Sequence, residues 1–134
     1  MSLAMSLQAC LLVLLGGFFG GTSRFFVSGA VGRRVGETFP WGTFAVNVSG
    51  SALIGFLAGL GQRHGGVFAG EAFRAFFIVG FCGGYTTVSS FSLQTLNLAL
   101  DGEQRGAAFN VVASALACLA ATGAGFLAAA GLAR

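Results

Sequence analysis

The sequence predicts an all-α membrane protein, and three observations support this fold class. Of its 134 residues, 55% are hydrophobic and only 8% carry a charge, whereas a soluble domain has about 25% charged residues. Four apolar runs are each long enough to cross a bilayer, which takes roughly 20 residues. The length fits a single domain over residues 1–134.

The predicted membrane spans are approximately 3–23, 40–61, 72–100 and 106–132, and the short breaks between them hold most of the charge. Backbone polar groups in lipid must be paired within the chain, so each span is a helix or part of a closed barrel. Runs this long and continuous are typical of helices. Because no basic residue precedes the first run and no clear cleavage site follows it, we expect a retained helix rather than a signal peptide.

Small residues recur at four-residue spacing in three of the spans, a pattern that lets helix backbones approach closely. We therefore expect tight helix packing along these stripes. They pair Gly16 with Gly20, Gly17 with Gly21, Gly55 with Ser51 and Gly59, and Gly80 with Gly84.

The arginines are almost evenly divided between the two sides of the membrane that four spans define. One side holds Arg63, Arg74 and Arg134, and the other holds Arg24, Arg33, Arg34 and Arg105. Orientation follows the Lys/Arg imbalance, so this near-balance predicts insertion in both orientations. An antiparallel homodimer then becomes possible, while a fixed orientation set by another signal stays open.

The polar residues inside the spans are neutral, since no Asp, Glu or Lys lies within any of them. A proton-coupled transporter generally keeps a carboxylate in the membrane, so the sequence argues against a small four-helix exporter of organic cations. Thr43 and Asn47 share one helical face, and Asn110 and Ser114 share another. A membrane amide has two donors to satisfy, so we expect Asn47 to face a partner, a cavity or a permeant species.

The stretch "GFCGGYTTVSSFS" (80–92) interrupts the third span. Each glycine lowers helix stability by about 1 kcal/mol relative to alanine, so the paired glycines before Tyr-Thr-Thr predict a break near Gly83–Thr86. Broken helices at membrane depth can present main-chain carbonyls to a cation. The break therefore indicates either an ion site or a simple kink.

Three motifs together resemble the small fluoride channels of the CrcB/Fluc type. They are "GGFFGGTSRF" (16–25), "FPWGTFAVNVSGSALIGF" (39–56) and the 80–92 stretch, and the resemblance covers nearly the whole chain. It implies a non-enzymatic, passive channel that exports fluoride from the cytoplasm across the cell inner (plasma) membrane. It also implies a dual-topology, antiparallel homodimer with two antiparallel pores, a third helix broken near its middle and a structural sodium ion at the centre.

The resemblance also implies roles for individual residues. The backbone carbonyls of Gly83 and Thr86 would hold the sodium ion, and Arg24 would lie at the end of the first helix near a pore mouth. Val88 departs from the family pattern, which has phenylalanine there, so half of an aromatic pair is missing. The residues expected to line the fluoride pore are Thr43, Asn47, Val88, Ser90, Phe91 and Ser114.

A physical rationale supports these pore residues. Fluoride must exchange its water shell for donors, which the amide of Asn47 and nearby hydroxyls can supply without a full charge. Conduction needs moderate binding at several sites, and the positive edge of the Phe91 ring can also contact an anion.

Two alternative functions remain. One is the exporter above, and the other is a non-transporting assembly subunit, against which the polar faces at 43–47 and 86–97 argue.

Overall fold

The computed structural model describes residues 3–36 and 38–132, and side chains from residue 6 onward. Within those ranges the chain is helical, with no strand. Helices long and apolar enough to cross a membrane cover Ser6–Val35, Trp41–His64, Glu71–Leu100 and Gln104–Gly131. The prediction of an all-α, multi-pass membrane protein is therefore confirmed. The charge of Arg134, counted above, lies outside the described residues.

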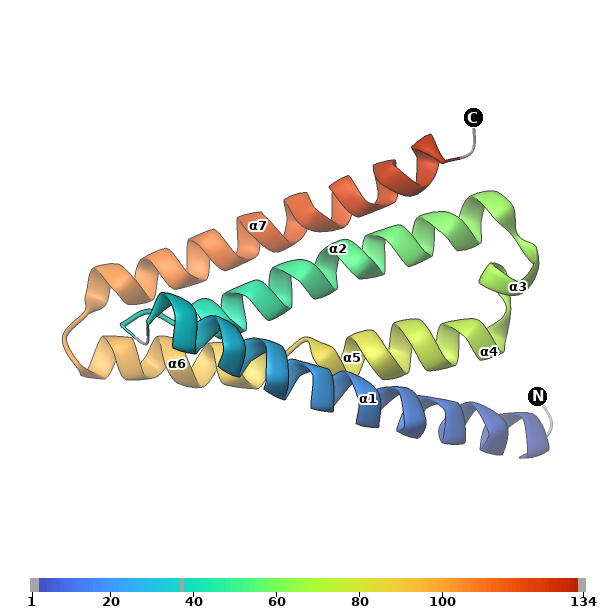
Figure 1. Ribbon diagram of the computed structural model, residues 1–134, viewed down its shortest axis with the longest axis horizontal. Helices are drawn as coiled ribbons and strands as arrows, with labels where there is room; N and C mark the ends of the chain where they lie inside the picture. Colours follow the sequence, from blue (N-terminus) through green and yellow to red (C-terminus); the bar gives the residue numbers. More distant parts are fainter. Residues whose placement is uncertain (1–2, 37, 133–134) are drawn as a thin grey trace.

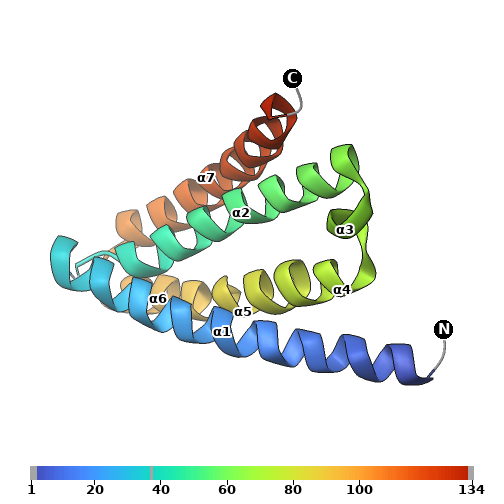
Figure 2. The same cartoon turned by 45° about the vertical axis from the view of Figure 1, so that its right-hand side comes forward.

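The four helical segments pack in two pairs. Helix α2 (Trp41–His64) contacts α7 (Gln104–Gly131), and α1 (Leu3–Val35) contacts the first half of the third segment. Figures 1 and 2 show these pairs side by side, with both termini at the end of the bundle that carries the short helix α3 (Gly66–Ala69). The α1–α2 connection and the α6–α7 turn lie at the opposite end.

Helix α1 is longer than the predicted span 3–23, because it continues to Val35. It ends at Gly36, whose φ of 104° is a conformation that glycine adopts without strain. The Gly36 amide donates to the Gly32 carbonyl across this helix end. Arg24 therefore lies inside the helix, and the expectation that it marks the helix end is wrong. A long arginine can extend its charge along the helix, so one cation does not stop the helix there.

The third segment is composite. It comprises α4 (Glu71–Phe73), the π-helix η1 (Arg74–Cys82), α5 (Gly83–Tyr85) and α6 (Val88–Leu100). The sequence did not predict the π-helix. Glu71, the first residue of this segment, is exposed and lies one residue before the predicted span. The interior of the described spans thus holds no carboxylate.

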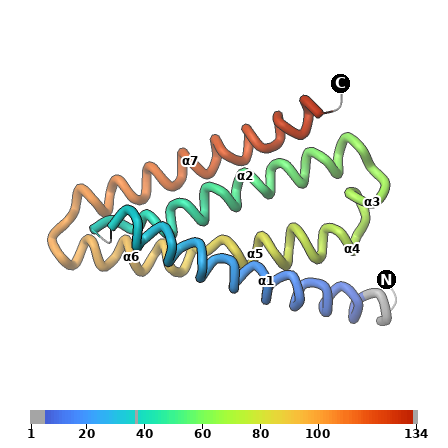
Figure 3. The backbone as a smooth tube through the Cα atoms, in the orientation of Figure 1, coloured from blue at the N-terminus to red at the C-terminus, as the bar shows by residue number. Residues whose placement is uncertain are grey.

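The predicted break exists, and it overlaps the expected range, Gly83–Thr86, at Thr86. Thr86 (φ −77°, ψ 156°) and Thr87 (φ −150°, ψ 118°) are extended, and the tube in Figure 3 loses its coil between α5 and α6. Gly83 and Gly84 are helical instead. Gly84 serves close packing, because a Cβ there would lie 2.6 Å from the Gly17 carbonyl oxygen.

Most of the small-residue stripes pack helices closely, as predicted, but a Cβ on Gly17 or Gly21 would make only ordinary contacts, at 3.9 and 4.0 Å. A Cβ on Gly16 would lie 2.8 Å from the backbone nitrogen of Phe81, and one on Gly59 would lie 2.8 Å from the Cβ of Ala129. A Cβ on Gly55 would overlap the Thr122 carbonyl of α7. Ser51 is a further exception, since it lines a cavity described below.

Candidate functional site

The break in the third segment is held by the side chain of Asn47. Its Nδ2 donates to the Thr87 carbonyl oxygen at 3.0 Å, and its Oδ1 accepts from the Thr87 amide at 2.7 Å. A residue on α2 thus satisfies both backbone polar groups of Thr87, as buried backbone requires. One Nδ2 hydrogen remains for another acceptor.

Thr87 also caps the N-terminus of α6. Its Oγ1 accepts from the Ser90 amide at 3.1 Å, donates to Ser90 Oγ at 3.1 Å, and lies 3.1 Å from Ser89 Oγ. Ser90 accepts in this arrangement, so its own hydroxyl hydrogen stays available. The N-terminal turn of a helix carries partial positive charge, which lies here at the centre of the segment.

A first cavity, the Asn47 cavity, has a volume of about 440 Å³ and lies beside the break. It brings together four of the predicted pore residues, Asn47, Val88, Phe91 and Ser114. No charged residue lines it, and Ser51, Thr86 and Thr87 add polar groups. Val88 is 76% exposed in the single chain. The wall of the cavity that carries Val88 is therefore not covered by other residues of the same chain.

Ser114 is held by a chain of hydrogen bonds from α7 to α6. Its hydroxyl donates to Asn110 Oδ1 at 3.3 Å, and Asn110 Nδ2 donates to Thr95 Oγ1 at 2.8 Å. Thr95 in turn donates to the Phe91 carbonyl at 2.7 Å. Asn110 is only 2% exposed. The 3.3 Å bond is long for a hydroxyl donor, so the Ser114 hydroxyl can turn toward the cavity at little cost.

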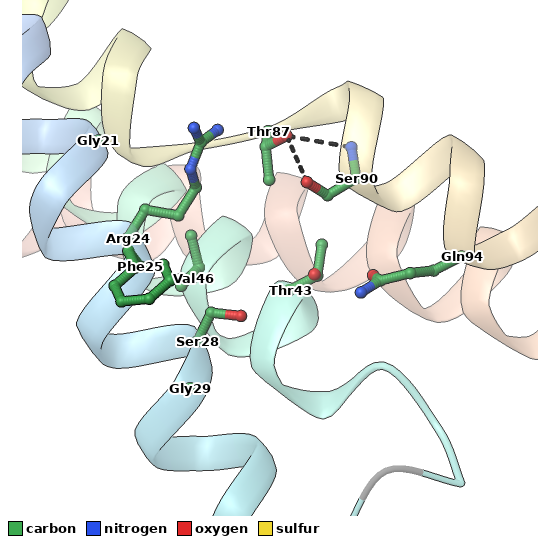
Figure 4. A pocket seen from close by; sticks show the side chains of 10 residues that line it. All are labelled: Gly21, Arg24, Phe25, Ser28, Gly29, Thr43, Val46, Thr87, Ser90 and Gln94. Atoms are coloured by element: carbon green, nitrogen blue, oxygen red, sulfur yellow. Dashed lines mark hydrogen bonds between the residues drawn. The ribbon is translucent and has the colours of Figure 1, made fainter.

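A second cavity, the Thr43 cavity, has a volume of about 350 Å³ and contains the other predicted residues, Arg24, Thr43 and Ser90. Figure 4 shows Arg24 reaching from α1 toward the segment that carries Thr87. Thr43 is 5% exposed, and its hydroxyl has no hydrogen-bond partner among the described residues. Thr87 lines both cavities, so the break lies between them.

Gln94 is a lining residue that the sequence analysis did not select. It follows Ser90 by one helical turn on α6, lines the Thr43 cavity, and its Oε1 is a buried acceptor without a partner. Figure 4 shows its amide directed toward Thr43. The four-residue spacing from Ser90 was the available signal.

The predicted cation ligands lie at the break. In a continuous helix the Gly83 carbonyl would accept from the Thr87 amide, but that amide donates to Asn47. The Thr86 carbonyl would likewise accept from the Ser90 amide, but that amide donates to Thr87 Oγ1. A Cβ on Gly83 would meet nothing within 4 Å. Carbonyl oxygens of an unwound segment fit a hard cation such as sodium.

Comparison with known proteins places this architecture in a family. The family model described as CrcB-like protein, Camphor Resistance (CrcB), matches residues 11–126. A Brucella abortus protein named fluoride-specific ion channel FluC 4 is 65% identical over 122 residues, covering 91% of this chain and 92% of the relative.

More distant relatives carry similar names. A Bradyrhizobium diazoefficiens protein, fluoride-specific ion channel FluC 2, is 51% identical over 126 residues, covering 94% of this chain and 92% of the relative. A fluoride-specific ion channel FluC from Opitutus terrae is 51% identical over 122 residues, covering 91% and 92% respectively. With most of its length matched, this chain belongs to the CrcB-like protein family.

Proposed function

We propose that this chain forms a passive, fluoride-selective ion channel. The observation that carries the proposal is the Asn47 cavity, where neutral donors and one aromatic ring line the space beside a broken helix. The relatives' names, which specify a fluoride channel and not an enzyme, support the same ion.

Neutral donors suit an ion that must both bind and leave. Fluoride loses part of its water shell on entering, so the site must offer hydrogen bonds in exchange. The available donors are the second Nδ2 hydrogen of Asn47 and the hydroxyls of Thr43, Ser90 and Ser114. The ring edge of Phe91 adds a weaker positive contact. No acidic residue lines either cavity, so no full negative charge in the lining repels an anion.

We propose that both cavities belong to the fluoride pathway, because Thr43, Ser90 and Arg24 line one and Asn47, Phe91 and Ser114 line the other. Arg24 is then an internal positive charge along the pathway rather than a residue at a helix end. Its long side chain lets the charge lie near the break while the backbone stays in α1.

We further propose that two copies assemble antiparallel in the membrane, with two antiparallel pores. The exposed wall at Val88 and the open space beside Gly83 support a second copy at this face. Two carbonyls, from Gly83 and Thr86, are few ligands for a cation, and a second copy would double them. A sodium ion bound by these carbonyls would supply a fixed positive charge near the fluoride pathway.

The cell inner membrane is the proposed location, and export of fluoride down its gradient is the proposed role. A coupled exporter of organic cations is the alternative, and the described spans lack the interior carboxylate that such a protein needs.

The test is ion efflux from liposomes that contain the purified protein. A fluoride channel predicts rapid fluoride loss that needs no proton gradient, with much slower chloride loss under the same conditions. Proton-dependent movement of organic cations would select the exporter. Absence of any flux from well-folded protein would favour a non-transporting subunit.

A further inference from the structure

A third cavity, the Arg33 cavity, lies at the end of the bundle where α1 stops and α2 begins. Its volume is about 410 Å³, and its own lining includes Arg33, Gly36, Phe39, Pro40 and Trp41. It shares a set of lining residues with the Thr43 cavity, namely Ser28, Gly29, Thr43 and Gln94. The two cavities are therefore adjoining, and the Arg33 cavity lies on the side toward the bundle end.

The guanidinium of Arg33 lies close to Gly29, a residue that lines both of these cavities. A Cβ added at Gly29 would lie 3.1 Å from Arg33 Nη1 and 3.9 Å from Cζ. The side chain therefore folds back one turn along α1 and rests on the bare backbone of Gly29. Since Gly29 lines both cavities, the charge lies in the Arg33 cavity beside the lining that it shares with the Thr43 cavity.

The end of a helix alone does not account for this placement. Cations at a helix C-terminus are stabilised by the helix dipole, and this applies equally to Arg33 and Arg34 in the last turn of α1. Both are exposed, but Arg33 lines this cavity and Arg34 does not. The described residues supply Arg33 with no ion-pair partner, so its charge is not neutralised there.

We propose that Arg33 is an anion-collecting residue, which raises the local concentration of fluoride where the Arg33 cavity meets the Thr43 cavity. This inference rests on the proposed channel function. It assigns to Arg33 the step in which fluoride passes from water toward the Thr43 cavity. A charge in a cleft concentrates counter-ions, and one unit charge about 7 Å away in water gives about a threefold enrichment. Because Arg33 is exposed to water, its hold on the ion is weak, as conduction requires.

The first experiment compares Arg33→Gln with Arg34→Gln in fluoride efflux from neutral-lipid liposomes. An impermeant salt sets the ionic strength while the fluoride gradient stays constant. At about 0.01 M salt, where the Debye length is about 30 Å, we expect Arg33→Gln to slow efflux about threefold and Arg34→Gln to leave it unchanged. At about 1 M salt, where that length is about 3 Å, the variants should converge with the wild type. Arg33→Lys should retain most of the flux.

The second experiment moves the charge without removing it. Gly29→Ala places a methyl group 3.1 Å from Arg33 Nη1, so the flexible Arg33 side chain must shift by a few tenths of an ångström or more. We expect a partial, salt-dependent loss of flux in this variant. Gly123→Ala on α7 is the control, because a Cβ there meets nothing within 4 Å.

The outcomes separate this inference from the channel itself. If wild-type protein carries no fluoride, the proposed function fails. If wild type conducts but Arg33→Gln equals Arg34→Gln at low salt, Arg33 does not collect anions. An equal loss at every salt concentration would also overturn the proposal, since it would show a structural role instead.

Discussion

Asn47 pairs with both backbone polar groups of Thr87, at 3.0 and 2.7 Å, although the two residues are 40 positions apart. This pairing lets the third segment stay interrupted inside a membrane, where unpaired backbone groups cost several kcal/mol each. It also fixes the amide of Asn47 at the wall of a cavity. One side chain thus supports the break and presents a donor beside it.

Replacement of Asn47 by aspartate should abolish fluoride flux. Asn47→Asp keeps the acceptor for the Thr87 amide, but it removes the donor to the Thr87 carbonyl and places negative charge at the cavity. Liposome efflux measures the effect, with Asn97→Asp, an exposed α6 position away from these cavities, as the control. Undiminished flux in a folded Asn47→Asp protein would remove this residue from the pathway.

Replacement of Gly16 by alanine should destabilise the protein, whereas the same change at Gly17 should not. A Cβ on Gly16 would overlap the Phe76 carbonyl and lie 2.8 Å from the Phe81 nitrogen, but one on Gly17 would lie 3.9 Å from the nearest atom, the Gly80 carbonyl oxygen. Overpacking of this kind costs about 1–3 kcal/mol. Thermal unfolding in detergent compares the two variants, and equal melting temperatures would contradict the tight α1–η1 contact.

The sequence predicts the fold well because membrane spans depend on composition. Three of the four spans agree with the structure to within three residues, since charged breaks delimit them. The end of α1 was missed because Arg24 resembles a terminal cation, whereas the helix ends only where Gly36 turns to positive φ. The expected break began at Gly83, but tight packing on α1 holds Gly84 in a helix despite its low propensity, so the extended residues are Thr86 and Thr87.

The residues that line the Asn47 cavity could be predicted from the sequence by their type but not by their contacts. Asn47, Phe91 and Ser114 do line one cavity, and neutral polar residues in apolar spans were the signal. The partner of Asn47 is a backbone group, which has no signature in the sequence. Gln94 and Asn110 were overlooked as site residues for a related reason, since only the packing of α6 shows which face of each helix is turned inward.

Introduction of phenylalanine at Val88 should increase fluoride flux. Val88 lines the Asn47 cavity together with Phe91, and a second ring edge would add a positive contact for the anion. We expect an increase of at least about twofold in Val88→Phe relative to wild type, and no increase in Val88→Leu, which adds bulk without a ring. Equal flux in both variants would show that the aromatic edge contributes nothing at this position.

Sodium should stabilise the protein more than potassium or a large organic cation does. If the carbonyls of Gly83 and Thr86 bind the ion only in the folded assembly, the melting temperature rises with its concentration. Thermal unfolding over a series of sodium concentrations at constant ionic strength measures this. Identical curves in sodium and in the organic cation would contradict a sodium site at the break.

The reversal potential in a planar bilayer tests the central claim most directly. With a tenfold fluoride gradient and equal chloride on both sides, a passive fluoride-selective channel predicts a current that reverses near 59 mV in magnitude, about the Nernst value for a monovalent ion. A reversal potential near zero, or one that follows an imposed proton gradient instead, would contradict it.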